Sequence, residues 1–221
     1  MMKTALILGA TGLVGKQLLL QLLDNQNYNK AVVFVRRSTG IVHPKLQEWI
    51  VDFDSMSSWR EKVKGDVLFS TLGTTLKQAG SKEAQKRVDY TYQYEVARMA
   101  AENGVPDYVL VSTPGASENS WIFYTRIRGE LDRDIKKLPF KRIIILKPSV
   151  LDGEREVKRR GEEIGISLSN LLKHIPGLKK YQSIAGRIVA SAMIGALEKP
   201  QKSRIEEYEL DELFQFSPGS E

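Results

Sequence analysis

A glycine-rich segment near the start of the chain most constrains the fold. It reads Gly9-Ala10-Thr11-Gly12-Leu13-Val14-Gly15, follows an apolar strand candidate at 5–8 and leads into an amphipathic helix candidate at 13–24. A glycine at the end of a buried parallel strand permits the sharp turn into the helix and lets a ligand approach the backbone closely. The order strand, glycine loop, helix therefore favours a site for a dinucleotide pyrophosphate at the helix N-terminus.

The three glycines have different expected tasks. Gly9 and Gly12 suit the turn and the close approach of the pyrophosphate, whereas Gly15 would let the first helical turn press against the strand. The spacing is GxxGxxG and differs from the GxGxxG pattern of many dinucleotide sites. An ordinary strand-to-helix loop is the alternative interpretation of the same residues.

The second strand candidate ends in two basic residues. Arg36 and Arg37 follow the apolar run at 31–35, where a Rossmann unit meets the adenosine ribose. Arginine offers bidentate donors to a 2′-phosphate, so the pair favours NADP(H) over NAD, unless it is only a solvated pair at the strand end. Downstream, Asp52 could accept a hydrogen bond from the adenine amino group while Phe53 lies against the ring. A plain loop acid is the alternative for Asp52.

Strand and helix candidates alternate along the chain, as βαβ crossovers require. The strands are expected at 5–8, 31–35, 67–71, 108–112 and 142–146, and the helices at 13–24, 82–103 and 121–137. Beyond Pro148 we expect a loop at 152–165, helices at 166–174 and 183–198, and a tail at 203–216 that includes a short last strand. The pattern predicts one α/β domain over 1–221, a doubly wound parallel-sheet Rossmann fold whose small C-terminal extension at 151–221 covers the substrate side.

Composition excludes several kinds of chemistry. The chain has no cysteine and only two histidines, His43 and His174, so the residues for a metal site or a Ser-His-Asp triad are few and neither is expected. No apolar run is long enough to span a bilayer, and the first residues enter a strand without a signal-peptide pattern, so we expect a cytosolic protein. The net charge of +6 includes a basic run at 155–160 without interleaved aromatic residues, which argues against nucleic acid.

Three residues form a candidate catalytic set. Ser112 closes the fourth strand candidate, and Tyr124 and Arg128 follow at a spacing of four, which puts a phenol and a cation on one helix face. A fixed positive charge favours the phenolate and lowers the pKa of a tyrosine, so Tyr124 could exchange a proton with a substrate carbonyl or hydroxyl. Ser112 would orient the same oxygen. A Tyr/Arg pair at this spacing also arises by chance.

Several motifs together resemble a known family. They are the glycine loop, Leu72-Gly73-Thr74-Thr75 with Ala79-Gly80-Ser81, Val88-Asp89-Tyr90, and the Ser112/Tyr124 pair. Over nearly the whole chain they look like the atypical short-chain dehydrogenase/reductases, most of all the Tat-interacting-protein branch of NAD(P)H-binding, oxidoreductase-like or epimerase-like proteins. The Leu-Gly-Thr-Thr run is the most branch-specific element, although residues 73–75 alone could be a simple turn.

The resemblance implies a Rossmann protein that binds NADPH. It implies that the pyrophosphate is held by Gly9, Thr11, Gly12, Leu13 and Val14, the 2′-phosphate by Arg36 and Arg37, the adenine by Asp52 and Phe53, the ribose side by Leu72, Gly73 and Thr74, and the nicotinamide by Pro148 with Ser149 and Val150. It also assigns catalysis to Ser112, Tyr124 and position 128.

One departure from the family bears on activity. The family carries lysine at position 128, and here it is Arg128, whose forked guanidinium does not replace an ammonium at a tight site. Two functions therefore stay open: an NADP-dependent oxidoreductase for a small carbonyl or alcohol, and a catalytically weak protein in which NADPH controls binding of a protein partner. A nucleoside-diphosphate-sugar epimerase ranks third because the part beyond Pro148 is small. Substrate, partners and oligomeric state stay open.

Overall fold

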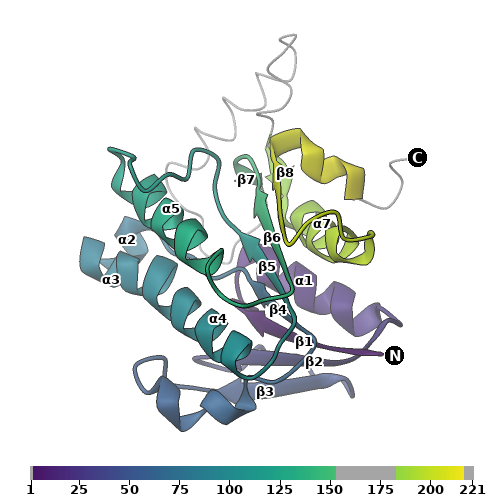
Figure 1. Ribbon diagram of the computed structural model, residues 1–221. Coiled ribbons are helices and arrows are strands. Elements are labelled where there is room, and N and C mark those ends of the chain that lie inside the picture. Colours follow the sequence, from purple (N-terminus) through teal and green to yellow (C-terminus); the bar gives the residue numbers. More distant parts are fainter. Residues whose placement is uncertain (1, 153–182, 217–221) are drawn as a thin grey trace.

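A seven-stranded, entirely parallel sheet forms the centre of the computed structural model, which describes residues 2–152 and 183–216 (Figure 1). Its strand order is β3-β2-β1-β4-β5-β6-β9. The strands are β1 Lys3–Leu8, β2 Tyr28–Val35, β3 Leu46–Ile50, β4 Val67–Ser70, β5 Asp107–Val111, β6 Arg142–Lys147 and β9 Ile205–Glu209. The first six follow the doubly wound order 3-2-1-4-5-6, which confirms the predicted Rossmann fold.

Helices cover both faces of the sheet (Figure 1). They are α1 Leu13–Asp24, α2 Leu76–Ala79, α3 Lys82–Lys86, α4 Tyr92–Glu102, α5 Phe123–Ile135 and α7 Gly186–Glu198, with short 3-10 turns at Met56–Ser58, Arg60–Lys62 and Leu210–Phe216. A separate two-stranded ribbon pairs β7 Leu151–Asp152 with β8 Ile184–Ala185.

The alternation of side chains along β1 divides the core in two. Ala5 and Ile7 face the layer of α1 and α7, whereas Leu6 and Leu8 face the layer of α4 and α5. All four side chains are fully buried, as expected for a central strand covered on both faces. β1 and β4 are neighbours, so the strand order reverses between them and opens a crevice at their carboxyl ends, where ligands of this fold class bind.

A buried arginine joins the C-terminal elements to the sheet. Arg142, the first residue of β6, donates hydrogen bonds to the carbonyl groups of Ala196, Leu197 and Lys199 at the end of α7. Its Nε also donates to Glu206 of β9 at 2.7 Å. The last carbonyls of a helix have no partner within the helix and favour a nearby cation, so Arg142 caps α7.

Several elements differ from the sequence-based expectation, among them α2, the β7–β8 ribbon, β3 and the middle helix. β3 was not predicted, because the edge strand Leu46–Ile50 mixes polar and apolar residues and none of its side chains is fully buried. The helix expected at 82–103 is interrupted by a π-helical turn at Arg87–Thr91. The expected loop at 152–165 lies outside the described residues except for residue 152, and the expected helix at 166–174 and the basic run at 155–160 lie wholly outside them. The expected last strand is β9, at 205–209.

Candidate functional site

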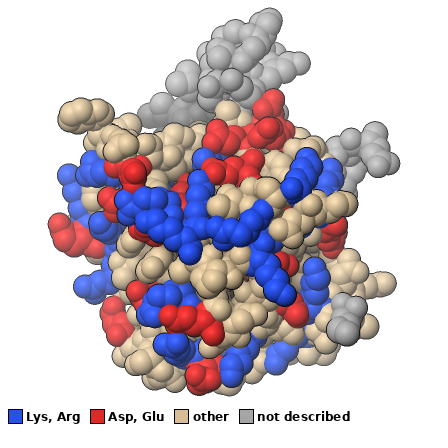
Figure 2. All heavy atoms as spheres, in the orientation of Figure 1, with Lys and Arg blue, Asp and Glu red and all other residues tan. Residues whose placement is uncertain are grey.

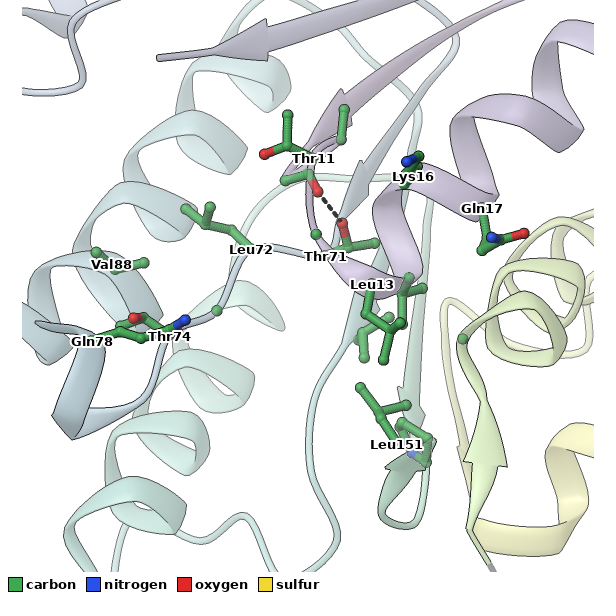
Figure 3. A pocket seen from close by; sticks show the side chains of 18 of the residues that line it. Thr11, Leu13, Lys16, Gln17, Thr71, Leu72, Thr74, Gln78, Val88 and Leu151 are labelled. Atoms are coloured by element: carbon green, nitrogen blue, oxygen red, sulfur yellow. Dashed lines mark hydrogen bonds between the residues drawn. The ribbon is translucent and has the colours of Figure 1, made fainter. Parts of the chain in front are cut away.

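A cleft of about 1460 Å³ opens at the carboxyl ends of the central strands. Side chains reach it from several elements: Leu13 from the start of α1, Leu72 and Thr74 from the segment after β4, and Leu151 from β7 (Figure 3). Most of the predicted site residues line it: Gly9, Thr11, Gly12, Leu13, Val14, Arg36, Arg37, Leu72, Gly73, Thr74, Ser112, Tyr124, Arg128 and Pro148. Ser149 and Val150 line it as well.

The backbone of the glycine loop packs against the segment after β4. Gly9 has φ +90°, a conformation that side chains rarely allow, and a Cβ there would lie 2.7 Å from the amide nitrogen of Leu72. A Cβ on Gly15 would overlap the carbonyl oxygen of Gly9 and lie 2.6 Å from Oγ1 of Thr71. Gly15 does not line the cleft, and its contacts fit the expected close packing of helix on strand. Thr71 donates its hydroxyl to the carbonyls of Leu8 and Gly9, which ties the loop to β4 (Figure 3).

The two arginines after β2 lie at one end of the cleft, where they and Thr11 also line a smaller hollow. The following loop is held by Glu48 of β3, which accepts hydrogen bonds from Oγ of Ser38 at 2.7 Å and from the backbone N–H of Thr39 at 2.8 Å. Burial alone would raise the pKa of Glu48, but the hydrogen bonds from Thr39 and Ser38 outweigh it and hold the pKa below its usual value. Glu48 therefore stays ionised and orders the loop.

Asp52 and Phe53 are not among the residues that line the cleft. The Asp52 carboxylate accepts from the N–H of Asp54 and from Oγ of Ser55, and so closes its own turn. Phe53 is buried, with its ring 5.6 Å from that of Trp59. Both residues close a short apolar stretch, and their contact with an adenine stays a prediction; the Phe53 ring itself packs in the core.

Ser112 is buried at the end of β5 and forms a hydrogen bond that the sequence did not indicate. Its hydroxyl donates to both carboxylate oxygens of Asp132 on α5, at 2.8 and 2.9 Å. Burial raises the pKa of Asp132 above its usual value, although the nearby charge of Arg128 and the hydrogen bond from Ser112 oppose this shift. While Asp132 is ionised, Ser112 donates to it and is left with lone pairs to accept a hydrogen bond from the cleft.

Arg128 is 2% exposed and forms hydrogen bonds with backbone atoms. Nη1 donates to the carbonyl of Asp89 at 3.2 Å, and Nη2 donates to the carbonyl of Val111. The Asp89 carbonyl lies in the π-helical turn and also accepts from Nε2 of Gln93. Nε of Arg128 is buried and has no hydrogen-bond partner among the described residues. The guanidinium thus joins the π-helical turn to the last residue of β5.

Tyr124 lies in the first turn of α5, one turn before Arg128, and is 37% exposed. Its side chain and that of Ser112 line the same cleft, so the structure brings the predicted phenol and hydroxyl to one site. The opposite wall includes the segment after β4, where the N–H of Thr74 donates to the buried Asp89 carboxylate at 3.2 Å. Asp89 thereby positions the Gly73-Thr74 backbone along the cleft.

Sequence reasoning missed several residues that line or support the cleft. Lys16 and Gln17 line it directly after the glycine loop, a position that could have indicated them. Arg187, at the start of α7, carries no local signal. Asp132 could have been found from its spacing of four after Arg128, since the two share a helix face.

Fold and site together define a nucleotide-binding protein of the Rossmann class, and the comparisons agree. Residues 9–156 match the family model described as NAD(P)H-binding. The protein FMP52, mitochondrial, of Candida glabrata is 36% identical over 212 residues, which cover 91% of this chain and 88% of that protein. The protein of the same name from Eremothecium gossypii is 37% identical over 193 residues, 86% of this chain and 84% of that protein. The chain belongs to the NAD(P)H-binding family and shares it with these FMP52 proteins.

Solved structures show the same fold at low sequence identity. A UDP-glucose 4-epimerase from Thermotoga maritima superposes with a TM-score of 0.67 at 16% identity, over 96% of this chain and 80% of that one. A UDP-glucuronic acid 4-epimerase from Bacillus cereus, in complex with NAD, has a TM-score of 0.63 at 15% identity, over 93% and 76%. At these identities the likeness shows the fold, and it agrees with the predicted Rossmann architecture.

One expectation from the sequence is wrong. The lack of a leader pattern predicted a cytosolic protein, but the relatives from Candida glabrata, Eremothecium gossypii and Aspergillus niger are all named as mitochondrial proteins. The absence of a recognisable leader was a weak basis for predicting the location, because targeting signals vary more in sequence than a folded core does. Separately, no helix in the described ranges 2–152 and 183–216 is long and apolar enough to cross a bilayer.

Proposed function

We propose that the protein is an NADP(H)-dependent oxidoreductase that transfers hydride between the cofactor and a small carbonyl or alcohol. The observation that carries this proposal is the shared cleft: the glycine loop, the Arg36-Arg37 pair and the side chains of Ser112 and Tyr124 all line it. A cofactor held by the loop would extend from the arginines toward the serine and the tyrosine.

The residues present fit such a cofactor. The Cβ that any other residue would add at Gly9 has no room against Leu72, so the loop keeps its backbone free of side chains where a pyrophosphate would approach. α1 begins at Leu13, and its unpaired N-terminal amides and dipole favour a phosphate. Arg36 and Arg37 would meet a 2′-phosphate, which supports NADP(H) over NAD.

Tyr124 would be the acid/base of the reaction. While the Ser112 proton is donated to Asp132, Ser112 would accept a hydrogen bond from the hydroxyl of an alcohol; to hold a carbonyl oxygen it would turn that proton from Asp132 into the cleft. When bound, the nicotinamide supplies or accepts the hydride. Tyr124 would donate its phenolic proton to the carbonyl oxygen as the alcohol forms, and would take it back in the reverse direction. Arg128 contributes a fixed positive charge one turn along α5, although its N–H groups on Nη1 and Nη2 bond to backbone carbonyls.

Tyr124→Phe tests the chemistry. The phenylalanine keeps the ring and removes the proton, so we expect turnover with NADPH and a carbonyl panel to fall at least about a hundredfold. Because Tyr124 is placed beyond the phosphate-binding loop, the affinity for NADPH should change little. Activity that survives in this variant would remove Tyr124 from the mechanism.

The cofactor preference has its own test. The double variant Arg36→Ala with Arg37→Ala should weaken NADPH much more than NADH in calorimetric titrations, because only NADPH carries the 2′-phosphate. An equal loss for both cofactors would mean that the pair does not recognise that phosphate.

A second function is favoured by the surroundings of Arg128. Its Nη1 and Nη2 are engaged by the backbone carbonyls of Asp89 and Val111, which favours a site that binds NADPH but turns substrates over weakly. In this alternative, NADPH occupancy would control the binding of a protein partner. This alternative predicts tight NADPH binding by the wild type without measurable oxidation of NADPH by any carbonyl in the panel. Turnover that depends on Tyr124 would decide for the enzyme.

A further inference from the structure

Two apolar side chains project into solvent just before α5. Trp121 is 99% exposed and Ile122 is 66% exposed, although large apolar side chains of this kind are normally buried. Ser120 and the first turn of α5 hold them in place, since Oγ of Ser120 accepts from the N–H of Ile122 at 3.2 Å. At the start of α5, in the upper left of Figure 2, atoms that are neither acidic nor basic project beyond the charged surface.

Two cations flank this projection. Nζ of Lys82 lies 5.6 Å from the centre of the Phe123 ring, and the guanidinium carbon of Arg126 lies 5.8 Å from the same ring. Arg126 also donates from Nη1 to the carbonyl of Ser120 at 3.0 Å, which fixes it beside the exposed tryptophan. Neither Lys82 nor Arg126 forms a salt bridge with another residue of the described part of the chain. We call Trp121, Ile122, Lys82 and Arg126 the α5 tip.

We propose that the α5 tip docks the protein on an anionic lipid bilayer. Trp121 and Ile122 would enter the interface between headgroups and acyl chains, where tryptophan is favoured, and Lys82 with Arg126 would meet lipid phosphates. The combination of an apolar projection with flanking cations is the pattern of a peripheral membrane contact that needs two signals, one apolar and one electrostatic.

The size and shape of the α5 tip favour lipid over a protein partner. A stable protein interface uses about 20 to 30 residues on each side, whereas the exposed apolar part of the tip is two adjacent side chains on a projection. A bilayer needs no complementary pocket and accepts a small projection. Its negative surface also attracts Lys82 and Arg126, neither of which is held in a salt bridge within the described part of the chain, although Glu83 lies next to Lys82 in the sequence.

Docking would also orient the cleft. Tyr124 follows Ile122 by two residues and lines the cleft, so a docked tip holds this end of the cleft next to the membrane. An apolar ligand could then pass between the bilayer and the cleft without crossing bulk water. The docking itself does not depend on the oxidoreductase activity proposed above.

Vesicle co-sedimentation tests the proposal. The purified full chain should bind phosphatidylcholine vesicles that contain phosphatidylserine and bind pure phosphatidylcholine weakly, with binding lost as salt is raised. The double variant Trp121→Ala with Ile122→Ala should bind the anionic vesicles at least about tenfold more weakly than the wild type. The double variant Val42→Ala with Ile50→Ala, in which residues of nearly the same exposure change elsewhere, should bind as the wild type does.

The cations have a matched control as well. Lys82→Gln with Arg126→Gln should weaken binding about tenfold, and Lys30→Gln with Lys202→Gln, which removes the same charge elsewhere, should weaken it much less. NADPH affinity and the unfolding temperature show in each variant that the fold and the cleft are intact. If a variant fails to fold, a wild-type measurement replaces it: brominated lipid should quench the exposed Trp121 and leave the emission of the buried Trp59 and the partly buried Trp49 largely unchanged.

Three results would overturn the proposal. They are failure of the wild type to bind anionic vesicles, equal binding by the Trp121/Ile122 double variant, and a lipid-free self-association in sedimentation velocity that the same variant abolishes. The last result would make the α5 tip an interface between copies of the chain.

Discussion

Replacing Arg128 separates its support of the backbone from any direct role in the reaction. The guanidinium donates to the buried carbonyls of Asp89 and Val111 and lies close enough to Asp132 to lower the pKa of that carboxyl. Arg128→Met keeps much of the side-chain volume but removes the Arg128 donor to the Val111 carbonyl and one of the two side-chain donors to the Asp89 carbonyl, which keeps Gln93. It also leaves the buried Asp132 carboxylate without its nearby cation. The lost hydrogen bonds cost about 1–3 kcal/mol and the uncompensated carboxylate adds to this, so we expect a loss of about 3–5 kcal/mol in the free energy of unfolding.

The corresponding change in melting temperature follows from the length of the chain. At about 2.1 cal/mol/K per residue, the 221 residues give an unfolding entropy of about 0.46 kcal/mol/K. A loss of 3–5 kcal/mol therefore lowers Tm by about 6–11 °C. Arg128→Lys keeps the charge but has no planar fork to bond both carbonyls at once, so it should lose about half as much.

Thermal and urea unfolding followed by circular dichroism measure both variants, and calorimetric titration measures their NADPH affinity. Arg128→Lys should bind NADPH nearly as the wild type does, because the glycine loop and Arg36-Arg37 are unchanged. The reasoning fails if Arg128→Met unfolds within about 0.5 kcal/mol of the wild type, which is the usual range for surface substitutions, while cofactor affinity or turnover collapses. Arg128 would then act on the ligand.

Three further perturbations test other parts of the site. Gly15→Ala should cost about 1–3 kcal/mol or more and weaken NADPH binding, because its Cβ would overlap the Gly9 carbonyl; unchanged unfolding and unchanged affinity would contradict the packing. In the wild type, the buried Asp132 carboxyl holds its proton more tightly in the folded than in the unfolded state, so stability should fall as pH rises from 3.8 through the raised pKa of the folded state. Asp132→Asn should not show this fall. Identical pH profiles of unfolding for the two proteins would refute the reasoning. Glu48→Gln should weaken NADPH about threefold to tenfold and leave NADH unchanged in calorimetry, because the Ser38-Thr39 loop loses a charged acceptor, whereas tighter NADPH binding would mean that the carboxylate mainly repels the phosphate.

Local sequence patterns were sufficient to predict the parts of the fold that are buried on both faces. The apolar residues of β1 are continuous and those of α1 are periodic. Between them, Gly9 and Gly15 lie so close to neighbouring backbone that a Cβ would not fit. β3 could not be predicted in the same way, because as an edge strand it has mixed composition. Glu48 was therefore missed as a residue that orders the loop after Arg36-Arg37.

The surroundings of the candidate catalytic residues depended on tertiary packing. The sequence spacing indicated that Tyr124 and Arg128 share a helix face, and both line the cleft. The same spacing places Asp132 on that helix face, but it could not indicate that Ser112 donates to Asp132, because the two residues lie on different elements and meet only through tertiary packing. The π-helical turn likewise arises without a local signal, and its Asp89 carbonyl is satisfied by side chains from 4 and 39 residues away.

The cap that Arg142 forms on α7 limits how far the chain can be shortened from its C-terminal side. The family model ends at residue 156, but the acceptors of this buried guanidinium lie at 196–199 and 206. A fragment that stopped at residue 156 would retain the cation and lose every one of these acceptors, and it would also uncover the face of α1 that α7 protects. The part of the chain that matches the family model is thus shorter than the unit that must fold, and a fragment that keeps this cap has to extend through β9.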